Sequence, residues 1–189
     1  MPVRTTAVLA ALCGALSFAA GAQPVFDGFL CCNLRSDGHW ISDSNYIDEA
    51  KRVIPAGTPV RVTGYGRNRV HVEINGASQD LGNDYSRDLA LDVFAQRFVV
   101  REDPARKIAT ATPKIRDAIR SARVTRGMTR EQVAMAVGYP ISSENPRLDA
   151  PVWRMWIGSF SEYQVLFDGA GRVREVQTDP DTRKLVVMD

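Results

Sequence analysis

The residues of this chain best suited to chemistry are Cys31 and Cys32, which are adjacent in the sequence. A cysteine thiolate can act as a nucleophile, a metal ligand or one half of a disulfide. A vicinal disulfide closes so small a ring that it removes little unfolded-state entropy, compared with the ~3 kcal/mol expected for a 15-residue loop. We therefore expect such a bond to shape a turn rather than to staple the fold. Buried free thiols and bonding to a partner chain are the alternatives.

A histidine close to this pair, His39, raises two further possibilities. Together, Cys31, Cys32 and His39 could supply ligands to zinc, or Cys32 with His39 could form a thiol catalyst. A zinc site would need a second well-spaced ligand pair, which the sequence lacks. The other histidine of the chain, His71, alternates with valines and is expected on the solvent face of a strand. Motifs of serine hydrolases, zinc proteases and phosphate-binding loops are absent from the sequence, so we predict no enzymatic activity and no cofactor.

The N-terminal sequence predicts that the chain is exported. Arg4 gives a short positive region, residues 7–20 form an uncharged run rich in alanine and leucine, and small residues precede a cleavage site after Ala22. Gly14 interrupts the run, which is shorter than the roughly 20 residues needed to cross the ~30 Å hydrocarbon core of a membrane. The sequence therefore predicts a cleaved signal peptide over residues 1–22.

The same pattern predicts a periplasmic or secreted protein without a membrane anchor. Cys13 lacks the leucine three positions earlier that a lipobox requires, and no later apolar run is long enough to span a bilayer. Removal of residues 1–22 takes away one charged residue, Arg4, and lowers the formal net charge from +2 to +1. So small a net charge gives no indication of nucleic-acid binding. An oxidising compartment would favour the disulfide between Cys31 and Cys32.

Positive charge is concentrated in the middle of the chain. Residues 97–130 contain ten Lys and Arg against Glu102, Asp103 and Asp117. Three of the arginines share one face of a predicted helix because they are spaced i, i+4 and i+7: Arg116, Arg120 and Arg123. This face could attract anionic lipid headgroups, lipopolysaccharide phosphates or an acidic protein partner, or it could simply be a solvated helix face.

Residues 23–104 have the pattern of a β-rich module with one helix. Residues 60–63 and 70–74 alternate between apolar and polar, which predicts two strands of a hairpin. Asn75-Gly76 predicts a type I′ turn into a third strand near residues 78–81. Ser86 can cap a helix, and residues 105–112 are predicted as a linker. The module resembles a small SH3-type barrel of the kind found in bacterial envelope proteins.

Residues 113–178 predict a second module, followed by a tail over residues 179–189. Thr112 and Pro113 open one helix. Thr129 and Gln132 form a capping box at the start of a second helix. Gly138 and Pro140 end this helix after about two turns, so it needs a sheet to pack on. Three strands of an antiparallel meander follow, at residues 152–157, 163–167 and 172–176. The predicted fold class is therefore α+β, with a small β-rich module ahead of a helix-helix-sheet module.

The second module resembles the SmpA/OmlA (BamE-like) family over Ile115–Gln177. The resemblance rests on a Gly-Met-Thr-x-x-x-Val helix entry, a Gly-x-Pro exit, a strand containing tryptophan and a Phe-Asp-x-x-Gly-x-Val hairpin. It implies protein–protein contact at the envelope, a link to outer-membrane protein assembly or envelope integrity, and no catalysis. The same module is similar to the repeats of the β-lactamase inhibitory protein, which implies inhibition of a secreted enzyme as an alternative. Unlike the family, this chain lacks a lipobox and has an additional module in front.

Three aromatic residues of the predicted sheet are candidates for the partner-binding face: Trp153, Trp156 and Phe160. Aromatic anchors concentrate binding energy in protein interfaces. A three-stranded sheet over two short helices also needs large side chains for its own core, so we expect at least one tryptophan to be buried. The sequence thus predicts an exported envelope interaction protein, with a redox or metal-dependent enzyme using Cys31, Cys32 and His39 as the competing hypothesis.

Overall fold

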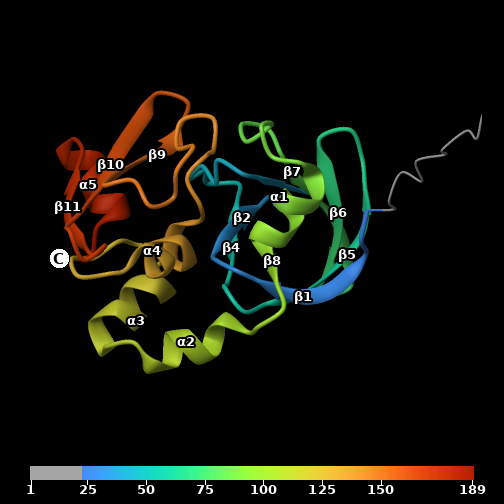
Figure 1. Ribbon diagram of the computed structural model, residues 1–189, viewed down its shortest axis with the longest axis horizontal. Coiled ribbons are helices and arrows are strands. Elements are labelled where there is room, and N and C mark those ends of the chain that lie inside the picture. Colours follow the sequence, from blue (N-terminus) through green and yellow to red (C-terminus); the bar gives the residue numbers. More distant parts are fainter. Residues whose placement is uncertain (1–22) are drawn as a thin grey trace, which may run out of the picture.

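The computed structural model describes residues 23–189 and has an α+β fold (Figure 1). A curled eight-stranded sheet occupies the N-terminal part, and a separate three-stranded sheet with most of the helices forms the C-terminal part. The predicted signal peptide, with Arg4, Cys13 and the cleavage site after Ala22, lies outside the described residues. None of the helices that are described is long and apolar enough to cross a membrane.

The larger sheet has the strand order β4-β2-β3-β7-β6-β5-β1-β8. Neighbouring strands are antiparallel except for β3 and β7, which run parallel. Its strands are β1 (Phe26–Leu30), β2 (Leu34–Ser36), β3 (Trp40–Ser42), β4 (Arg52–Ile54), β5 (Pro59–Tyr65), β6 (Arg69–Ile74), β7 (Ala77–Gly82) and β8 (Val99–Val100). Helix α1 (Leu91–Phe98) packs into the same core through Phe94 and Phe98, whose rings lie 4.9 Å apart.

The central hairpins of this sheet confirm the strands predicted over residues 60–81. Val60, Val62, Val70 and Val72 are buried while the residues between them are more exposed, because successive side chains of a strand point to opposite faces. Asn75-Gly76 joins β6 to β7 with φ values of 53° and 77°. Both lie in the left-handed region that a type I′ turn requires.

Ser86 was predicted to cap the first helix, but α1 begins at Leu91, so this cap assignment was wrong. The residue that precedes α1 is Ala90, which makes no side-chain capping hydrogen bond. Ser86 is buried, and its Oγ accepts a hydrogen bond from the backbone N–H of Ser142 at 3.1 Å. A polar side chain that could cap a helix locally is thus used in a contact between distant segments.

The C-terminal part confirms the order of two helices followed by a three-stranded antiparallel meander. Its sheet has the order β11-β10-β9 and one face packs on the helices, with Trp153 and Met155 of β9 and Tyr163 and Val165 of β10 in the core. The elements are α3 (Pro113–Arg120), α4 (Arg130–Val137), β9 (Val152–Gly158), β10 (Ser161–Phe167) and β11 (Val173–Gln177).

Two further helices occupy segments for which the sequence predicted no helix. Helix α2 (Pro104–Thr110) takes up most of the predicted linker, and α5 (Pro180–Val186) takes up most of the predicted tail. In each, an aspartate caps the helix and proline holds the first helical position, Asp103-Pro104 and Asp179-Pro180. Proline is favoured at this position because its missing N–H would have no partner there. The prolines therefore begin helices rather than interrupt them.

Helix α4 forms as its capping box predicts. Thr129 Oγ1 accepts from the backbone N–H of Gln132, and the Gln132 side chain accepts from the backbone N–H of Thr129. Gly138 follows the helix with a φ of 87°. All five residues from Val133 to Val137 are buried, so this short helix is enclosed on nearly every side. It lies between the two parts of the protein (Figure 1).

Candidate functional site

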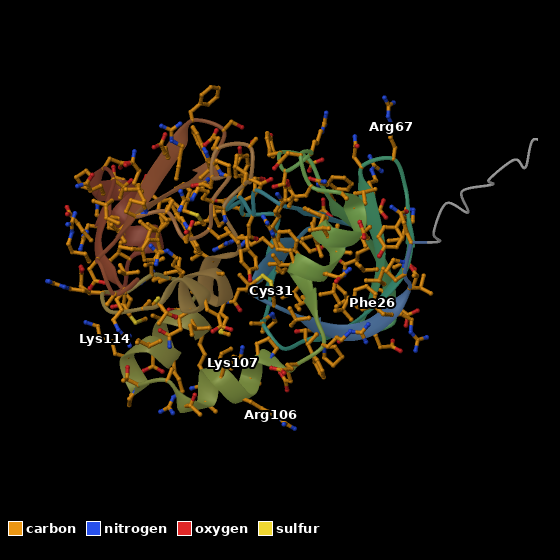
Figure 2. All side chains as sticks on the ribbon, viewed as in Figure 1. Phe26, Cys31, Arg67, Arg106, Lys107 and Lys114 are labelled. Carbon is orange, nitrogen blue, oxygen red and sulfur yellow. A yellow bond between two sulfur atoms is a disulfide. The ribbon has the colours of Figure 1, made fainter. Side chains whose placement is uncertain are left out.

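The structure joins Cys31 and Cys32 by a disulfide in the turn between β1 and β2. Cys31 is 6 % exposed and Cys32 is fully buried. The backbone N–H of Cys31 donates to the carbonyl of Phe98 at 2.9 Å, which ties the turn to the end of α1. Cys31 lies where the two parts of the protein meet, near Lys107 of α2 (Figure 2). The disulfide therefore belongs to a buried junction.

The next residue, Asn33, connects the two parts directly. Its backbone N–H donates to the carbonyl of Met135 at 2.9 Å. Its side-chain Nδ2 donates to the carbonyls of Ile119 at 2.6 Å and Ala136 at 3.0 Å. Its Oδ1 accepts from the backbone N–H of Ala56 at 2.9 Å. A single buried asparagine thus bonds to α3, to α4 and to the N-terminal part.

A second buried asparagine, Asn45, completes this arrangement. Its Nδ2 donates to the carbonyl of Val137 at 2.8 Å and to that of Asn33 at 3.0 Å, while its Oδ1 accepts from the N–H of Arg35 at 2.8 Å. The last carbonyls of a helix have no partner within the helix. Here the carbonyl of Met135 accepts from the backbone N–H of Asn33, and those of Ala136 and Val137 accept from the side chains of Asn33 and Asn45. Two residues of the N-terminal part thus cap the C-terminus of α4.

Close packing at this point explains the glycine that follows α4. A Cβ on Gly138 would lie 3.1 Å from Nδ2 of Asn45. The φ of 87° is also one that residues with a side chain rarely adopt. The glycine that the sequence identified as a helix end therefore also makes room for the asparagine cap.

A cavity of about 270 Å³ opens beside the disulfide, between the edge of the larger sheet, α2 and α4. Its walls are mainly apolar and its rim carries charges of both signs. The lining residues are Cys31, Val100, Arg101, Glu102, Pro104, Lys107, Glu131, Ala134, Met135 and Tyr139. This junction cavity combines a disulfide with a site large enough for a small ligand, and we take it as the candidate functional site.

Two groups that line the junction cavity are held in place by their neighbours. Lys107 Nζ and Glu131 Oε1 are 2.7 Å apart and join α2 to α4. The Tyr139 ring packs edge-on against Phe98, with centroids 6.1 Å apart, and Arg97 lies 5.6 Å from the same ring. Burial raises the pKa of Tyr139 because it disfavours the phenolate, and the positive charge of Arg97 opposes this shift.

The structure does not bring His39 to the cysteines. His39 lines a different cavity, together with His71 and Asp80, whereas Cys31 lines the junction cavity. Within residues 23–189 no group of three or more His, Cys, Asp or Glu side chains is arranged to hold a metal ion. The proposed ligand set of Cys31, Cys32 and His39 is therefore not assembled.

An unexpected pair forms between His71 and Asp80, whose Nδ1 and Oδ1 atoms are 2.6 Å apart. The His71 side chain, predicted to face solvent, is 45 % exposed. Asp80 also contacts Arg69 at 3.5 Å. The sequence contained a signal for this pair: a two-residue turn at Asn75-Gly76 sets residues 74 and 77 opposite each other, and the same register sets His71 opposite Asp80.

The predicted basic face of α3 is only partly available. Arg116 Nη1 donates to the carbonyl of Ala109 at 3.0 Å, at the end of α2. Arg120 is exposed and lies 3.9 Å from Asp117, and Arg123 is half-buried. A different basic group, not predicted from the sequence, surrounds a cavity of about 310 Å³, to which four separated segments contribute Lys114, Arg126, Arg174 and Arg183. Glu175 and Asp189 also line this cavity. Such convergence comes from the tertiary fold and has no signal in local spacing.

The three aromatic candidates have different environments. Trp153 is buried, packs edge-on against Phe167 with centroids 5.1 Å apart, and is therefore unavailable to a partner. Trp156 is half-buried, and its Nε1 donates to a carboxylate oxygen of Glu144 at 2.9 Å. Phe160, between β9 and β10, is 98 % exposed.

Comparison of the chain with protein-family models, curated proteins and solved structures finds no match.

Proposed function

We propose that the protein is an exported, non-enzymatic interaction protein of the cell envelope, which binds a protein partner through the tip of the β9–β10 hairpin. The observation that carries the proposal is the 98 % exposure of Phe160. A buried phenylalanine contributes about 1.5–3 kcal/mol relative to an exposed one, so an apolar pocket on a partner would gain most of this energy. Large aromatic anchors of this kind dominate binding energy in interfaces.

The pairing of β9 with β10 fixes the backbone on both sides of Phe160 before a partner binds. Ser161 pairs with Gly158, so Ser159 and Phe160 form the tip, and the next pair is Glu162 with Trp156. Close to the tip, Arg154 lies 3.2 Å from Glu162, and the Trp156 indole is bonded to Glu144. A preorganised contact loses less conformational entropy on binding than a mobile one.

We also propose a more specific fold for each of the two parts and a cellular location for the protein. The N-terminal part is proposed to be SH3-like and the C-terminal part BamE-like, in a periplasmic or secreted protein linked to outer-membrane assembly or envelope integrity. The order of two helices and a three-stranded antiparallel meander supports the second assignment. The disulfide between Cys31 and Cys32 supports an oxidising compartment, where such bonds persist.

Replacing the exposed aromatic tests the proposed contact. Phe160→Ser is expected to weaken capture of the partner roughly 30-fold, equivalent to about 2 kcal/mol, while thermal stability stays unchanged because the side chain has no core contacts. The measurement is crosslinking in the periplasm followed by affinity purification and quantitative mass spectrometry, with the melting temperature measured in parallel.

Val93→Ser on α1 is the matched control, because Val93 is 48 % exposed and lies in the other part of the protein. Capture should be the same for this variant as for the unmodified protein. Equal capture by the Phe160 variant would refute the proposed contact. Vesicle binding that depends on Phe160 would instead assign the tip to a lipid surface and contradict a protein partner. Recovery of a secreted enzyme that the protein inhibits would favour the inhibitor alternative.

A further inference from the structure

We propose that the junction cavity binds a small uncharged aromatic ligand and that the Cys31–Cys32 disulfide controls access to it. This site is separate from the hairpin tip and does not depend on the function proposed there. The cavity suits such a ligand by its size, the chemistry of its wall and the balance of charge at its rim, and the disulfide forms part of that wall.

The cavity wall is suited to an aromatic ring. It presents the Cys31 side of the disulfide, the thioether of Met135 and the ring of Tyr139, with Pro104 and Ala134 between them. Sulfur atoms make favourable contacts with aromatic rings at about 5 Å, worth roughly 0.3–1.5 kcal/mol each. The volume of about 270 Å³ is just below the ~300–1,000 Å³ typical of ligand sites, so a single ring system is the appropriate size.

The charges at the rim favour a ligand without net charge. Among the lining residues, Arg101 and Lys107 carry two positive charges and Glu102 and Glu131 carry two negative ones. Arg97 does not line the cavity, and its guanidinium lies 5.6 Å from the Tyr139 ring. Lys107 and Glu131 already form an ion pair at 2.7 Å. Neither an anion nor a cation would gain from the net field of this rim, and either would lose hydration on entering an apolar cavity. A neutral aromatic molecule incurs no such loss.

The two cysteines differ in a way that couples the redox state to the cavity. Cys32 is fully buried, whereas Cys31 lines the cavity. Reduction leaves two thiols that are no longer held together by a bond. Because Cys32 is fully buried and Cys31 lines the cavity, the free space next to the released thiol of Cys31 is the cavity itself. The oxidised form thus has an open cavity and the reduced form a partly filled one.

The reductant for this step is a dithiol. One of its thiolates attacks Sγ of Cys31, which forms a mixed disulfide and releases Cys32 as a thiolate that takes up a proton. The second thiolate of the reductant then attacks the reductant sulfur that is bonded to Cys31. This step releases Cys31 as a thiolate, which also takes up a proton. Two electrons and two protons pass to the protein, and the reductant ends as a cyclic disulfide.

The test uses 5-fluoroindole as the probe, with binding to the full-length mature protein followed by fluorine NMR. Saturable binding is expected in the oxidised protein. At least tenfold weaker binding is expected in dithiothreitol, with reduction verified by mass after thiol alkylation of a parallel sample. The charged analogues 5-fluorotryptamine and 5-fluoroindole-3-acetate should also bind at least tenfold more weakly than the neutral probe.

Two variants locate the binding site and separate it from effects of the reductant. Ala134→Leu places three more carbons in the cavity wall and should reduce binding at least tenfold, whereas Ala109→Leu on the exposed face of α2 should leave binding unchanged. The double variant Cys31→Ser/Cys32→Ser removes the disulfide without any reductant and should bind the probe weakly. If Ala134→Leu fails to fold, weak binding by this double variant places the probe beside the disulfide.

Absence of saturable binding in the oxidised protein would overturn the ligand site. Binding that persists in Ala134→Leu would place the ligand elsewhere and would also overturn the assignment of the ligand site to the junction cavity. Equal affinity in oxidised protein, reduced protein and the double serine variant would overturn control by the disulfide. Equal affinity for the two charged analogues would overturn the assignment to uncharged ligands.

Discussion

Replacing Trp153 with alanine is expected to lower the free energy of unfolding by about 3–5 kcal/mol, the range for large aromatic side chains in a core. Trp153 is 1 % exposed and packs edge-on against Phe167. Its Nε1 donates to the carbonyl of Leu148 at 3.1 Å, so the substitution removes a hydrogen bond as well as the ring. The loss is measured by chemical denaturation followed by circular dichroism.

The matched control is Trp156→Ala in the same strand. The Trp156 ring is half-buried and its indole bonds to an exposed carboxylate, so the expected loss is about 1 kcal/mol. A Trp153 variant within 1 kcal/mol of the unmodified protein would contradict the assignment of this residue to the core. The comparison separates a structural tryptophan from a neighbour that the sequence alone could not distinguish from it.

Local signals in the sequence predicted the elements whose ends are specified by nearby residues. The capping box of Thr129 and Gln132 and the glycine after α4 fixed that helix, because every partner lies within a few residues. Asn75-Gly76 fixed the hairpin between β6 and β7 for the same reason. Such interactions depend on sequence spacing and backbone geometry alone.

The two helices that were not predicted, α2 and α5, also have a local signal in the sequence. Asp103-Pro104 and Asp179-Pro180 have the same capping and proline arrangement as Thr112-Pro113, which was predicted correctly. The difference lies in the residues that follow, since α3 has a clear apolar stripe and α2 and α5 do not. In seven-residue helices the capping residue and the proline at the start are therefore a stronger signal than apolar periodicity.

The junction and its cavity could not be predicted from local patterns. Asn33 is separated from its partners in α3 and α4 by 86 and 103 positions, and Asn45 is 92 positions from its partner in α4. The cysteine pair could be predicted to shape a turn, but its place in a cavity wall depends on where α2 and α4 pack. These contacts arise only after both parts of the chain have folded against each other.

Replacing Asn33 with alanine is expected to cost about 3 kcal/mol or more of the free energy of unfolding. The substitution removes both side-chain donors to the carbonyls of Ile119 and Ala136 and the acceptor for the N–H of Ala56. Each buried polar group left without a partner costs about 1–3 kcal/mol. Asn33→Asp should be no better, because a carboxylate cannot donate to the two carbonyls.

The measurement that identifies the cause is hydrogen exchange, together with denaturation. Because Asn33 caps α4 from the other part of the protein, its loss should speed exchange in the last turn of α4 more than in the β9–β10 hairpin. Asn68→Ala, in the loop between β5 and β6, is the control and should change stability by less than about 0.5 kcal/mol. If Asn33→Ala retains full stability, the asparagine cap does not hold the two parts together. If stability falls while α4 exchange is unchanged, the loss arises at the Ala56 contact instead.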